Sequence, residues 1–405
     1  MPDYIHESLE LVQTPSRADG AYLPTDAALQ AKHVAFVANS SWSIWQYRLG
    51  VIRTLLGQGA HVSVIAPADR ATDSLIALGC DFYPLRLEAK STNPLNDWHC
   101  FSQLLRLYGK LRPDCVFHYT IKPNIYGGLA AWLRRVPCIA VITGLGFAFI
   151  NDNPVARIAR SLYRISLHAP RQVWFLNTDD AREFASRRLV NVERSAILPG
   201  EGIDAGYYAP RQNQVSGSTR PFRFLLIARM LWDKGIGEYV EAARKIKRQA
   251  PDIVFQLLGP ADVQNPRAIS RAQLLEWEKE GVIEYLGTAP DVRPAIGQAD
   301  CVVLPSYREG MPRTLLEAAA MEKPIVATDV PGCRDIVRDG ITGRLCKPRS
   351  AGALQDAMLD IARMPRATLK TMGQSARHDA IQRFGERRVI EIYLKTLRNL
   401  CRDSN

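Results

Sequence analysis

Residues 300–323 read DCVVLPSYREGMPRTLLEAAAMEK, and this segment indicates how the chain folds. Its apolar start predicts a buried strand over 301–304, which a polar loop joins to a helix beginning at Pro312, because proline suits the first turn of a helix. Glu309 lies in the loop and Glu317 in the helix, with seven residues between them. The N–H groups at such a helix start attract phosphate, and carboxylates accept hydrogen bonds from sugar hydroxyls. The segment therefore predicts a site for a sugar that bears a phosphate.

The rest of the chain alternates strand and helix patterns, which is typical of parallel sheets covered by helices on both faces. Strands are predicted at His33–Ala38, His61–Ala66, Phe82–Leu85, Cys115–Tyr119, Cys138–Ile142, Val173–Phe175, Ala196–Leu198, Phe222–Ala228, Val254–Gly259, Ile283–Leu286, Cys301–Leu304 and Ile325–Thr328. The expected fold is α/β, with two doubly wound, Rossmann-like domains and a ligand cleft at the carboxyl ends of their strands. The predicted organisation is a mobile leader over 1–30, a first domain over 31–210, a linker over 211–221, a second domain over 222–383 and a last helix over 384–401.

Composition sets the class of protein. The 405 residues are 47% hydrophobic, and 52 basic against 41 acidic residues give a net charge of +11, which favours anionic partners. The eight cysteines are scattered without a C-x-x-C pair, so neither a disulfide framework nor a zinc site is expected. No signal peptide or bilayer-spanning stretch is recognised, and the expected location is the cytoplasm or the inner face of the plasma membrane.

Two cations follow the first predicted strand of the second domain. Arg229 and Lys234 are placed where a strand meets a helix, and Gly235 and Gly237 allow close approach of the backbone. A guanidinium and an ammonium there would neutralise a diphosphate and stabilise it as a leaving group. The alternative is a solvated surface pair, which the neighbouring Glu309 disfavours.

The phrases ARMLWDKG (228–235) and SYREGMPRTLLEAAAMEKPIVATDVPGCRDIVRDGITGRL (306–345) together resemble the family-4 retaining glycosyltransferases of the GT-B fold. The resemblance covers nearly the whole chain after residue 30. It implies that the last helix packs back on the first domain. It also implies donor-binding roles: Arg229 and Lys234 for the nucleotide diphosphate, Glu309 for the donor sugar, Glu317 for the ribose, and the backbone of Gly310, Met311 and Pro312 for sugar and phosphate.

Three phrases of the first domain, NSSWSIWQYR (39–48), HYTIKPNIYGGLAA (118–131) and ITGLGFAF (142–149), look like a narrower group. That group adds N-acetylhexosamine-type sugars to polyprenyl-diphosphate-linked glycans in bacterial surface polysaccharide assembly. The resemblance implies that His118 points into the cleft near the reacting centre, although a core histidine is the alternative. Many relatives carry histidine where this chain has Thr143. The expected acceptor-binding residues are Ser41, Arg48, Lys122, Asn124, Thr143 and Gly144, with Lys122 on the acceptor's diphosphate.

A basic amphipathic helix is predicted over 154–171. Its basic residues are Arg157, Arg160, Arg164 and Arg171, and its apolar residues are Val155, Ile158, Leu162 and Ile165. Such a helix can lie on an anionic membrane surface, and it can equally pack its apolar side on the sheet and show its arginines to water. Nucleic acid is not expected as a partner, because no aromatic residues are interleaved with the arginines.

The expected activity is transfer of a sugar from a UDP-sugar to a lipid-diphosphate-linked saccharide, with retention of configuration. No cofactor and no metal are expected, since the chain contains no Asp-x-Asp, and no G-x-G-x-x-G opens the first domain. Three alternatives remain at this stage: a UDP-sugar 2-epimerase, a transferase with a soluble acceptor, and a non-catalytic nucleotide-sugar-binding protein.

Overall fold

The structure is a computed structural model that describes residues 28–88, 93–145, 149, 154–210 and 220–402. Most of the predicted leader and of the predicted linker lies outside these residues. The leader prediction is wrong at its end, because Leu29 is fully buried.

The chain divides into two compact units. The N-terminal unit runs to Gly202 and includes Glu309–Met311 and the segment from Arg383 onward. The C-terminal unit contains Ile203–Arg308 and Pro312–Gln382. The predicted boundary at residue 210 is thus a few residues late. The reason is packing of 203–210 on the C-terminal unit: for example, the guanidinium of Arg293 lies 3.7 Å from the centre of the Tyr207 ring.

The N-terminal unit contains a seven-stranded parallel sheet in the order β3-β2-β1-β4-β5-β6-β7. Its strands are β1 (His33–Val37), β2 (His61–Ala66), β3 (Asp81–Pro84), β4 (Cys115–Tyr119), β5 (Cys138–Ile142), β6 (Gln172–Phe175) and β7 (Ser195–Ile197). Its helices are α1 (Ser41–Gly57), α2 (Thr72–Ala77), α3 (Pro94–Leu111), the π-helix η1 (Pro123–Gly127), α4 (Gly128–Arg134), α6 (Pro154–Ser166), α7 (Thr178–Ser186), η2 (Val192–Arg194) and α15 (Glu386–Arg402).

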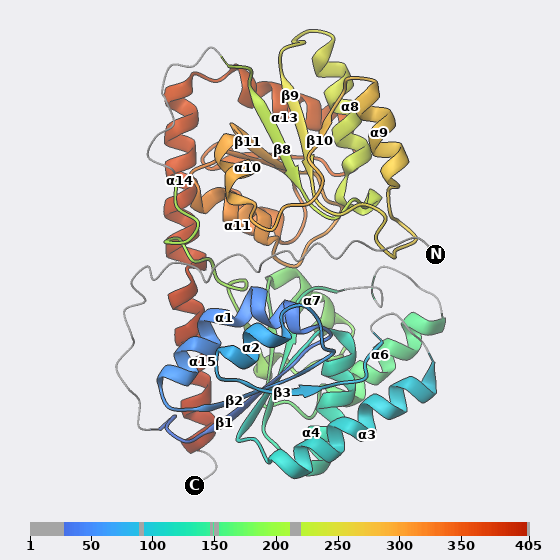
Figure 1. Ribbon diagram of the computed structural model, residues 1–405, viewed down its shortest axis with the longest axis vertical. Helices are drawn as coiled ribbons and strands as arrows, with labels where there is room; N and C mark the ends of the chain where they lie inside the picture. Colours follow the sequence, from blue (N-terminus) through green and yellow to red (C-terminus); the bar gives the residue numbers. More distant parts are fainter. Residues whose placement is uncertain (1–27, 89–92, 146–148, 150–153, 211–219, 403–405) are drawn as a thin grey trace. The chain divides into compact units, whose positions relative to one another are not determined.

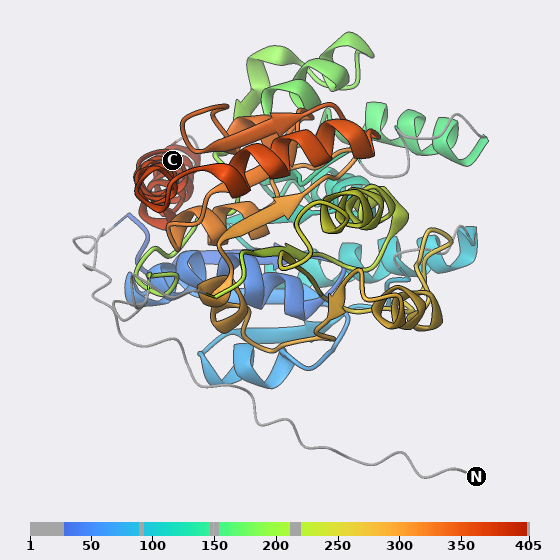
Figure 2. The same ribbon diagram turned by 90° about the horizontal axis from the view of Figure 1, so that it is seen from above.

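The C-terminal unit contains a six-stranded sheet in the order β10-β9-β8-β11-β12-β13. Its strands are β8 (Arg223–Ile227), β9 (Val254–Leu258), β10 (Glu284–Tyr285), β11 (Cys301–Leu304), β12 (Ile325–Thr328) and β13 (Gly343–Cys346). Its helices are η3 (Trp232–Lys234), α8 (Ile236–Lys247), α9 (Arg271–Lys279), α10 (Arg293–Gln298), α11 (Arg313–Ala320), α12 (Cys333–Ile336), α13 (Ala351–Arg363) and α14 (Arg366–Phe384). Helices lie on both faces of this sheet (Figures 1 and 2).

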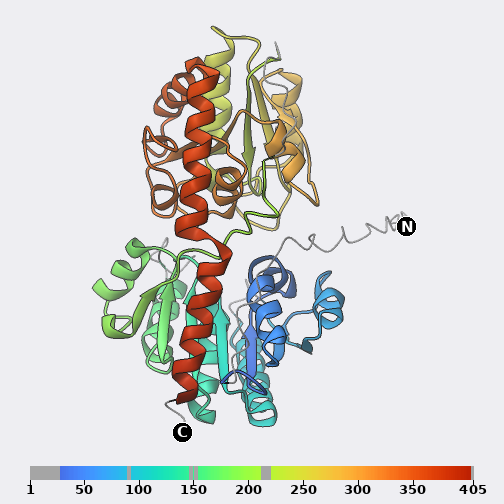
Figure 3. The ribbon, with the colours of Figure 1, turned by 90° about the vertical axis from the view of Figure 1, so that its left-hand side faces the viewer.

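The central strands are buried on both faces, which explains their almost continuous apolar sequences. Residues Val34–Val37 of β1 and Cys301–Leu304 of β11 are all buried. Helix α15 covers one face of the seven-stranded sheet, where Tyr393 packs against Phe117 and Trp174 (Figure 3). The two predicted doubly wound sheets are therefore confirmed, and all the predicted strands are present close to their predicted ends.

One strand was missed. The edge strand β13 has the sequence GRLC, and it pairs only with β12. A short edge strand needs no long apolar run, because one of its sides faces no other strand. The four residues GRLC contain no pattern strong enough to separate this strand from a loop.

Candidate active site

The order of the C-terminal sheet places its switch point between β8 and β11, where the connections leave in opposite directions and ligands of such folds bind. Arg229 and Lys234 follow β8 at this point, as predicted. Arg229 is exposed and makes no ion pair within the described part of the chain. Lys234 is half-buried as the last residue of η3. Two cations therefore lie at the edge where an anionic ligand would arrive.

The loops that follow β8 and β11 are packed together as one piece. Gly235 has a left-handed backbone with φ of 70°, and a β-carbon there would lie 2.1 Å from the carbonyl oxygen of Pro305. The backbone N–H of Tyr307 also donates to the carbonyl of Asp233 at 3.0 Å. Only glycine fits at position 235, and this fit holds Lys234 beside the loop that leads to Glu309.

Helix α11 begins at Arg313, one residue later than predicted, because Pro312 has an extended ψ of 109° and is the N-cap. No side chain caps this end. The hydroxyl of Thr314 donates to the carbonyl of Ile227 at 3.3 Å, which ties the first turn of α11 to the end of β8. The leading amides of α11 are thus held at the switch point, and the N-cap residue Pro312 offers them no side-chain acceptor.

The side chain of Glu317 is more deeply buried than a residue that binds the ribose needs to be. Its side chain is 8% exposed, and it accepts a hydrogen bond from Nε of Arg313 at 3.1 Å. It also interacts with Tyr208, whose pKa is raised by burial and by this carboxylate. Glu309 and Gly310 are half-buried and Met311 is almost fully buried. Sequence reasoning did not single out Arg313 or Tyr208, which lie on separate elements and carry no local motif.

The prediction that His118 points into a cleft is wrong. The side chain is fully buried under α3 and η1, and Nε2 is 2.8 Å from the hydroxyl of Tyr108. A β-carbon on Gly127 would lie within 2.5 Å of the imidazole, so the ring fills the space that this glycine leaves. Burial lowers the pKa of His118 to about 3, and the ring is neutral at physiological pH. His118 is therefore a core histidine.

This burial makes stability depend on pH. Between about pH 6.5 and pH 3 the unfolded chain binds a proton that buried His118 does not bind, so the free energy of unfolding falls as the pH falls. The slope from this one group is at most about 1.4 kcal/mol per pH unit. His118→Phe is expected to remove that part of the slope in urea titrations at several pH values. An exposed-histidine control, His168→Phe, should keep it; an unchanged slope in His118→Phe would show that the imidazole titrates normally.

Ser41 and Arg48 are engaged in the fold, which contradicts their predicted acceptor-binding roles. The hydroxyl of fully buried Ser41 donates to Asp69 at 2.6 Å, and Asp69 also accepts from the backbone of Trp42 at 2.9 Å. Arg48 is 4% exposed and forms an ion pair with Glu201. Its guanidinium lies 4.3 Å from the centre of the Tyr119 ring. Both side chains fix α1 to neighbouring segments.

Lys122 is paired as well. Its Nζ is 2.6 Å from Oδ1 of Asp97, and the other oxygen of this carboxylate accepts from the hydroxyl of Tyr126 at 2.8 Å. A substrate diphosphate would have to compete with Asp97 for this ammonium. The predicted role of Lys122 on the acceptor's diphosphate therefore has no support from its contacts.

The remaining predicted acceptor-binding residues lie close to one another in the structure. Asn124, Thr143 and Gly144 line one cavity of about 270 Å³ at the carboxyl ends of β4 and β5, with Thr120, Ile121, Ile142 and Tyr163. Thr120 has a left-handed backbone with φ of 68°, a conformation that costs roughly 1–2 kcal/mol for a residue with a β-carbon. The sequence could not indicate Thr120, because its strain arises only in the folded chain.

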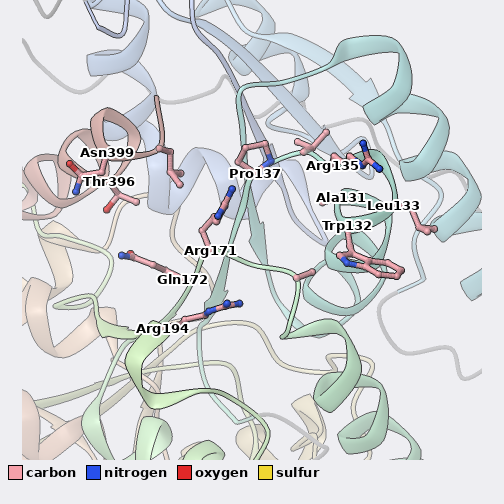
Figure 4. A pocket seen from close by; sticks show the side chains of 13 residues that line it. Ala131, Trp132, Leu133, Arg135, Pro137, Arg171, Gln172, Arg194, Thr396 and Asn399 are labelled. Atoms are coloured by element: carbon pink, nitrogen blue, oxygen red, sulfur yellow. The ribbon is translucent and has the colours of Figure 1, made fainter. Parts of the chain in front are cut away.

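A larger cavity lies at the opposite edge of the same sheet. Its volume is about 900 Å³, and its lining includes Pro137, Arg171, Gln172, Arg194 and Asn399 (Figure 4). Pro137 and Arg171 precede β5 and β6, so this cavity adjoins the amino ends of the strands. Ligands of doubly wound sheets bind at the carboxyl ends. Size therefore does not identify the acceptor site in this unit.

The basic helix is shorter than predicted, and its buried face is formed by other residues than predicted. Helix α6 ends at Ser166, so Arg171 is not part of it. Ala156, Tyr163 and Ser166 form the buried face, whereas Ile158 and Ile165 are 61% and 62% exposed. The interpretation that these isoleucines pack on the sheet is therefore wrong. None of the described helices is long and apolar enough to cross a bilayer.

Family models match both units. The model described as "Glycosyl transferase 4-like" matches residues 33–177, and the one described as "Glycosyl transferases group 1" matches residues 221–364. The matches include strands β1 to β6 of the N-terminal sheet, all strands of the C-terminal sheet and the loops at the C-terminal switch point. The chain therefore belongs to this glycosyltransferase family of the GT-B fold.

Within that family the chain is similar to two bacterial enzymes that act on lipid-linked sugars. One is the N,N'-diacetylbacillosaminyl-diphospho-undecaprenol alpha-1,3-N-acetylgalactosaminyltransferase of Campylobacter jejuni, 29% identical over 89% of this chain and 97% of the enzyme. The other is the UDP-Gal:alpha-D-GlcNAc-diphosphoundecaprenol alpha-1,3-galactosyltransferase of Escherichia coli, 23% identical over 72% and 76%. Among solved structures, Anabaena Alr3699/HepE in complex with UDP-glucose has the same fold, with a TM-score of 0.75, 18% identity, and coverage of 90% and 99%.

Proposed function

We propose that this protein is a retaining glycosyltransferase that moves an N-acetylhexosamine from a UDP-sugar to a saccharide carried on polyprenyl diphosphate. The observation that carries the proposal is the packed switch point of the C-terminal sheet. There the loop with Arg229 and Lys234 is held against the loop after β11, beside the uncapped start of α11. The names of the two lipid-dependent relatives support the choice of acceptor.

The reaction needs a stabilised leaving group. The bond between the anomeric carbon and the UDP oxygen breaks, and the acceptor oxygen bonds to the same face of that carbon. Arg229, Lys234 and the α11 amides stabilise the negative charge on the departing diphosphate. The leaving phosphate oxygen takes the acceptor's proton, Glu309 orients the donor ring, and Glu317 holds the ribose. His118 has no part in this scheme, since it is buried and neutral.

The test is a panel of UDP-sugars incubated with purified protein and polyprenyl-diphosphate-linked mono- and disaccharides. Product mass identifies transfer, and the proton coupling of the new anomeric centre identifies its configuration. Transfer to the lipid-linked saccharide with an α-linkage from an α-donor is expected. Conversion of the UDP-sugar without acceptor would identify a 2-epimerase, and transfer only to soluble sugars would overturn the lipid acceptor.

Glu309→Gln separates chemistry from binding. We expect turnover to fall about 100-fold, because a neutral amide holds the donor ring less firmly in the transition state. UDP affinity, measured by calorimetry, should stay within about twofold, since the cations and the α11 amides remain. Glu276→Gln on the exposed face of α9 is the matched control. Unchanged turnover in Glu309→Gln would remove this residue from the site.

We further propose that α6 docks the protein on the inner face of the plasma membrane. Its exposed face carries Ile158 and Ile165 beside Arg157 and Arg164. At the start of α3, Leu95 is also 67% exposed, and α3 and α6 both contact η1, which carries Asn124. Apolar side chains flanked by arginines suit an anionic bilayer, and a lipid-linked acceptor would then be near the 270 Å³ cavity.

The double variant Arg157→Gln/Arg164→Gln tests this docking. Each cation near anionic headgroups contributes about 1 kcal/mol, so sedimentation with phosphatidylglycerol vesicles should weaken about 30-fold. The exposed pair Arg248 and Arg271 in the C-terminal unit, changed in the same way, controls for net charge. Equal losses in both double variants would indicate a general charge effect and no docking by α6.

A further inference from the structure

The cavity at the ends of β4 and β5 contains polar groups that the fold leaves without partners. Asn124 is fully buried, and its Nδ2 donates to the carbonyl of Val141 at 3.0 Å. Its Oδ1 accepts no hydrogen bond from the described residues. Burial raises the pKa of Tyr163, and the neighbouring side chain of Asn124 partly offsets this rise. The cavity therefore holds a buried acceptor that calls for a donor.

A second polar side chain of this cavity likewise has no hydrogen-bond partner among the described residues. This side chain is that of Thr120, and its hydroxyl is buried. Thr120 is held in a left-handed conformation, and Asn124 is held by the π-helix η1. Both are backbone features that cost stability and are often found at functional sites. Two strained elements thus place a buried acceptor and a buried hydroxyl in residues that line one small cavity.

The rest of the lining defines the ligand's charge and size. None of the described residues that line the cavity is charged, and the side chain of nearby Lys122 is paired with Asp97, so these residues offer a diphosphate no cation. Ile121, Ile142 and Tyr163 supply apolar surface. The volume of about 270 Å³ is smaller than the roughly 300–1,000 Å³ of whole-ligand pockets, which limits the occupant to about one sugar residue with its substituent.

We infer that this cavity binds the acetamido group of the acceptor's terminal sugar and so selects N-acetylated acceptors. The amide N–H donates to Oδ1 of Asn124, the amide carbonyl accepts from the Thr120 hydroxyl, and the methyl group lies against Ile121, Ile142 and Tyr163. A sugar hydroxyl at the same position could meet one of the polar groups but would leave the apolar wall without a partner. This selection rests on the proposed glycosyltransferase function.

The variant Thr120→Val tests whether the cavity selects N-acetylated acceptors. Valine keeps the shape and the branched β-carbon of threonine and removes only the hydroxyl. The acceptors are polyprenyl-diphosphate-linked N-acetylglucosamine and the matching glucose compound. Wild type should prefer the acetamido acceptor, and Thr120→Val should lower kcat/KM for it about tenfold while changing glucose transfer less than about twofold. Thr54→Val, which removes a half-buried hydroxyl from α1, is the control. Ile121→Phe narrows the cavity and should cause a similar selective loss.

Binding of the acetamido group can also be measured in the absence of sugar transfer. Saturation-transfer NMR with methyl N-acetyl-α-glucosaminide should show its strongest signal at the acetyl methyl protons, and Thr120→Val and Ile121→Phe should weaken it. Equal binding of methyl α-glucoside, or an acetyl signal that neither variant changes, would overturn the acetamido site even if transfer is active. Absence of transfer to any lipid-linked acceptor, with the acetyl signal intact, would overturn the proposed function and leave the cavity's ligand class standing.

Discussion

Lys234→Met is expected to lower kcat/KM for sugar transfer about 1,000-fold, because a neutral side chain of similar length cannot stabilise the departing diphosphate. The effect should be this large because the position of Lys234 is fixed by the fold. The left-handed Gly235 and the hydrogen bond between Tyr307 and Asp233 hold its loop against the end of β11. The backbone of Lys234 is therefore already in place before the donor arrives, and little reorganisation of the loop offsets the contribution of this side chain.

The measurement is the initial rate of transfer together with UDP affinity by calorimetry. Both should fall, since the charge acts on the diphosphate in the ground state and more strongly in the transition state. Lys245→Met changes a cation on α8 that pairs with Glu241 on the helix surface, and it should leave both quantities unchanged. If Lys234→Met retains wild-type affinity and rate, the diphosphate is held elsewhere and the proposed donor site is wrong.

Glu201→Leu is expected to destabilise the protein by about 3–5 kcal/mol, because it leaves Arg48 as a buried charge without a partner. Arg48 and Glu201 are 4% and 9% exposed at their side chains. Arg48 also lies over the ring of Tyr119, whose hydroxyl is 2.8 Å from that of Tyr393 on α15. The ion pair therefore connects α1, β4 and α15 inside the N-terminal unit.

Urea unfolding provides the measurement. The double variant Arg48→Met/Glu201→Leu should recover most of the lost stability, since apolar residues of similar volume often replace a buried ion pair at little cost. Glu391→Gln breaks the pair with Arg387, whose side chains are 52% and 72% exposed, and should change stability by less than about 0.5 kcal/mol. A small effect of Glu201→Leu would mean that water reaches Arg48.

The fold was predictable because strand runs such as VVL and IVAT are apolar enough to require burial on both faces, and the turns between them contain glycine and proline. The residues of the proposed donor site could be singled out for a similar reason. They form two short motifs, residues 229–235 and 309–317, and each motif follows directly after a strand, β8 and β11 respectively. The contacts of Glu317 with Arg313 and Tyr208 were not predictable in full, since Tyr208 comes from a distant segment.

Three of the acceptor-side predictions, which rested on the family resemblance, failed. His118, Ser41 and Arg48 have chemistry that suits catalysis or binding, and each is buried with a partner from another element: Tyr108, Asp69 and Glu201. Such partners lie far away in the sequence, so no spacing rule identifies them. Conversely, Thr120 seemed ordinary until its backbone conformation and the neighbouring cavity were known.

The sequence by itself determined the two parallel sheets and placed the residues of the proposed anion site directly after β8 and β11, because both depend on local apolar runs and on short-range motifs. The tertiary structure alone decided which polar residues of the N-terminal unit are paired in its core. It also decided that Oδ1 of Asn124 and the hydroxyl of Thr120, in residues that line one cavity, have no hydrogen-bond partner among the described residues. The physical reason is that satisfying a buried polar group depends on its neighbours in space, and folding brings those neighbours from distant parts of the chain.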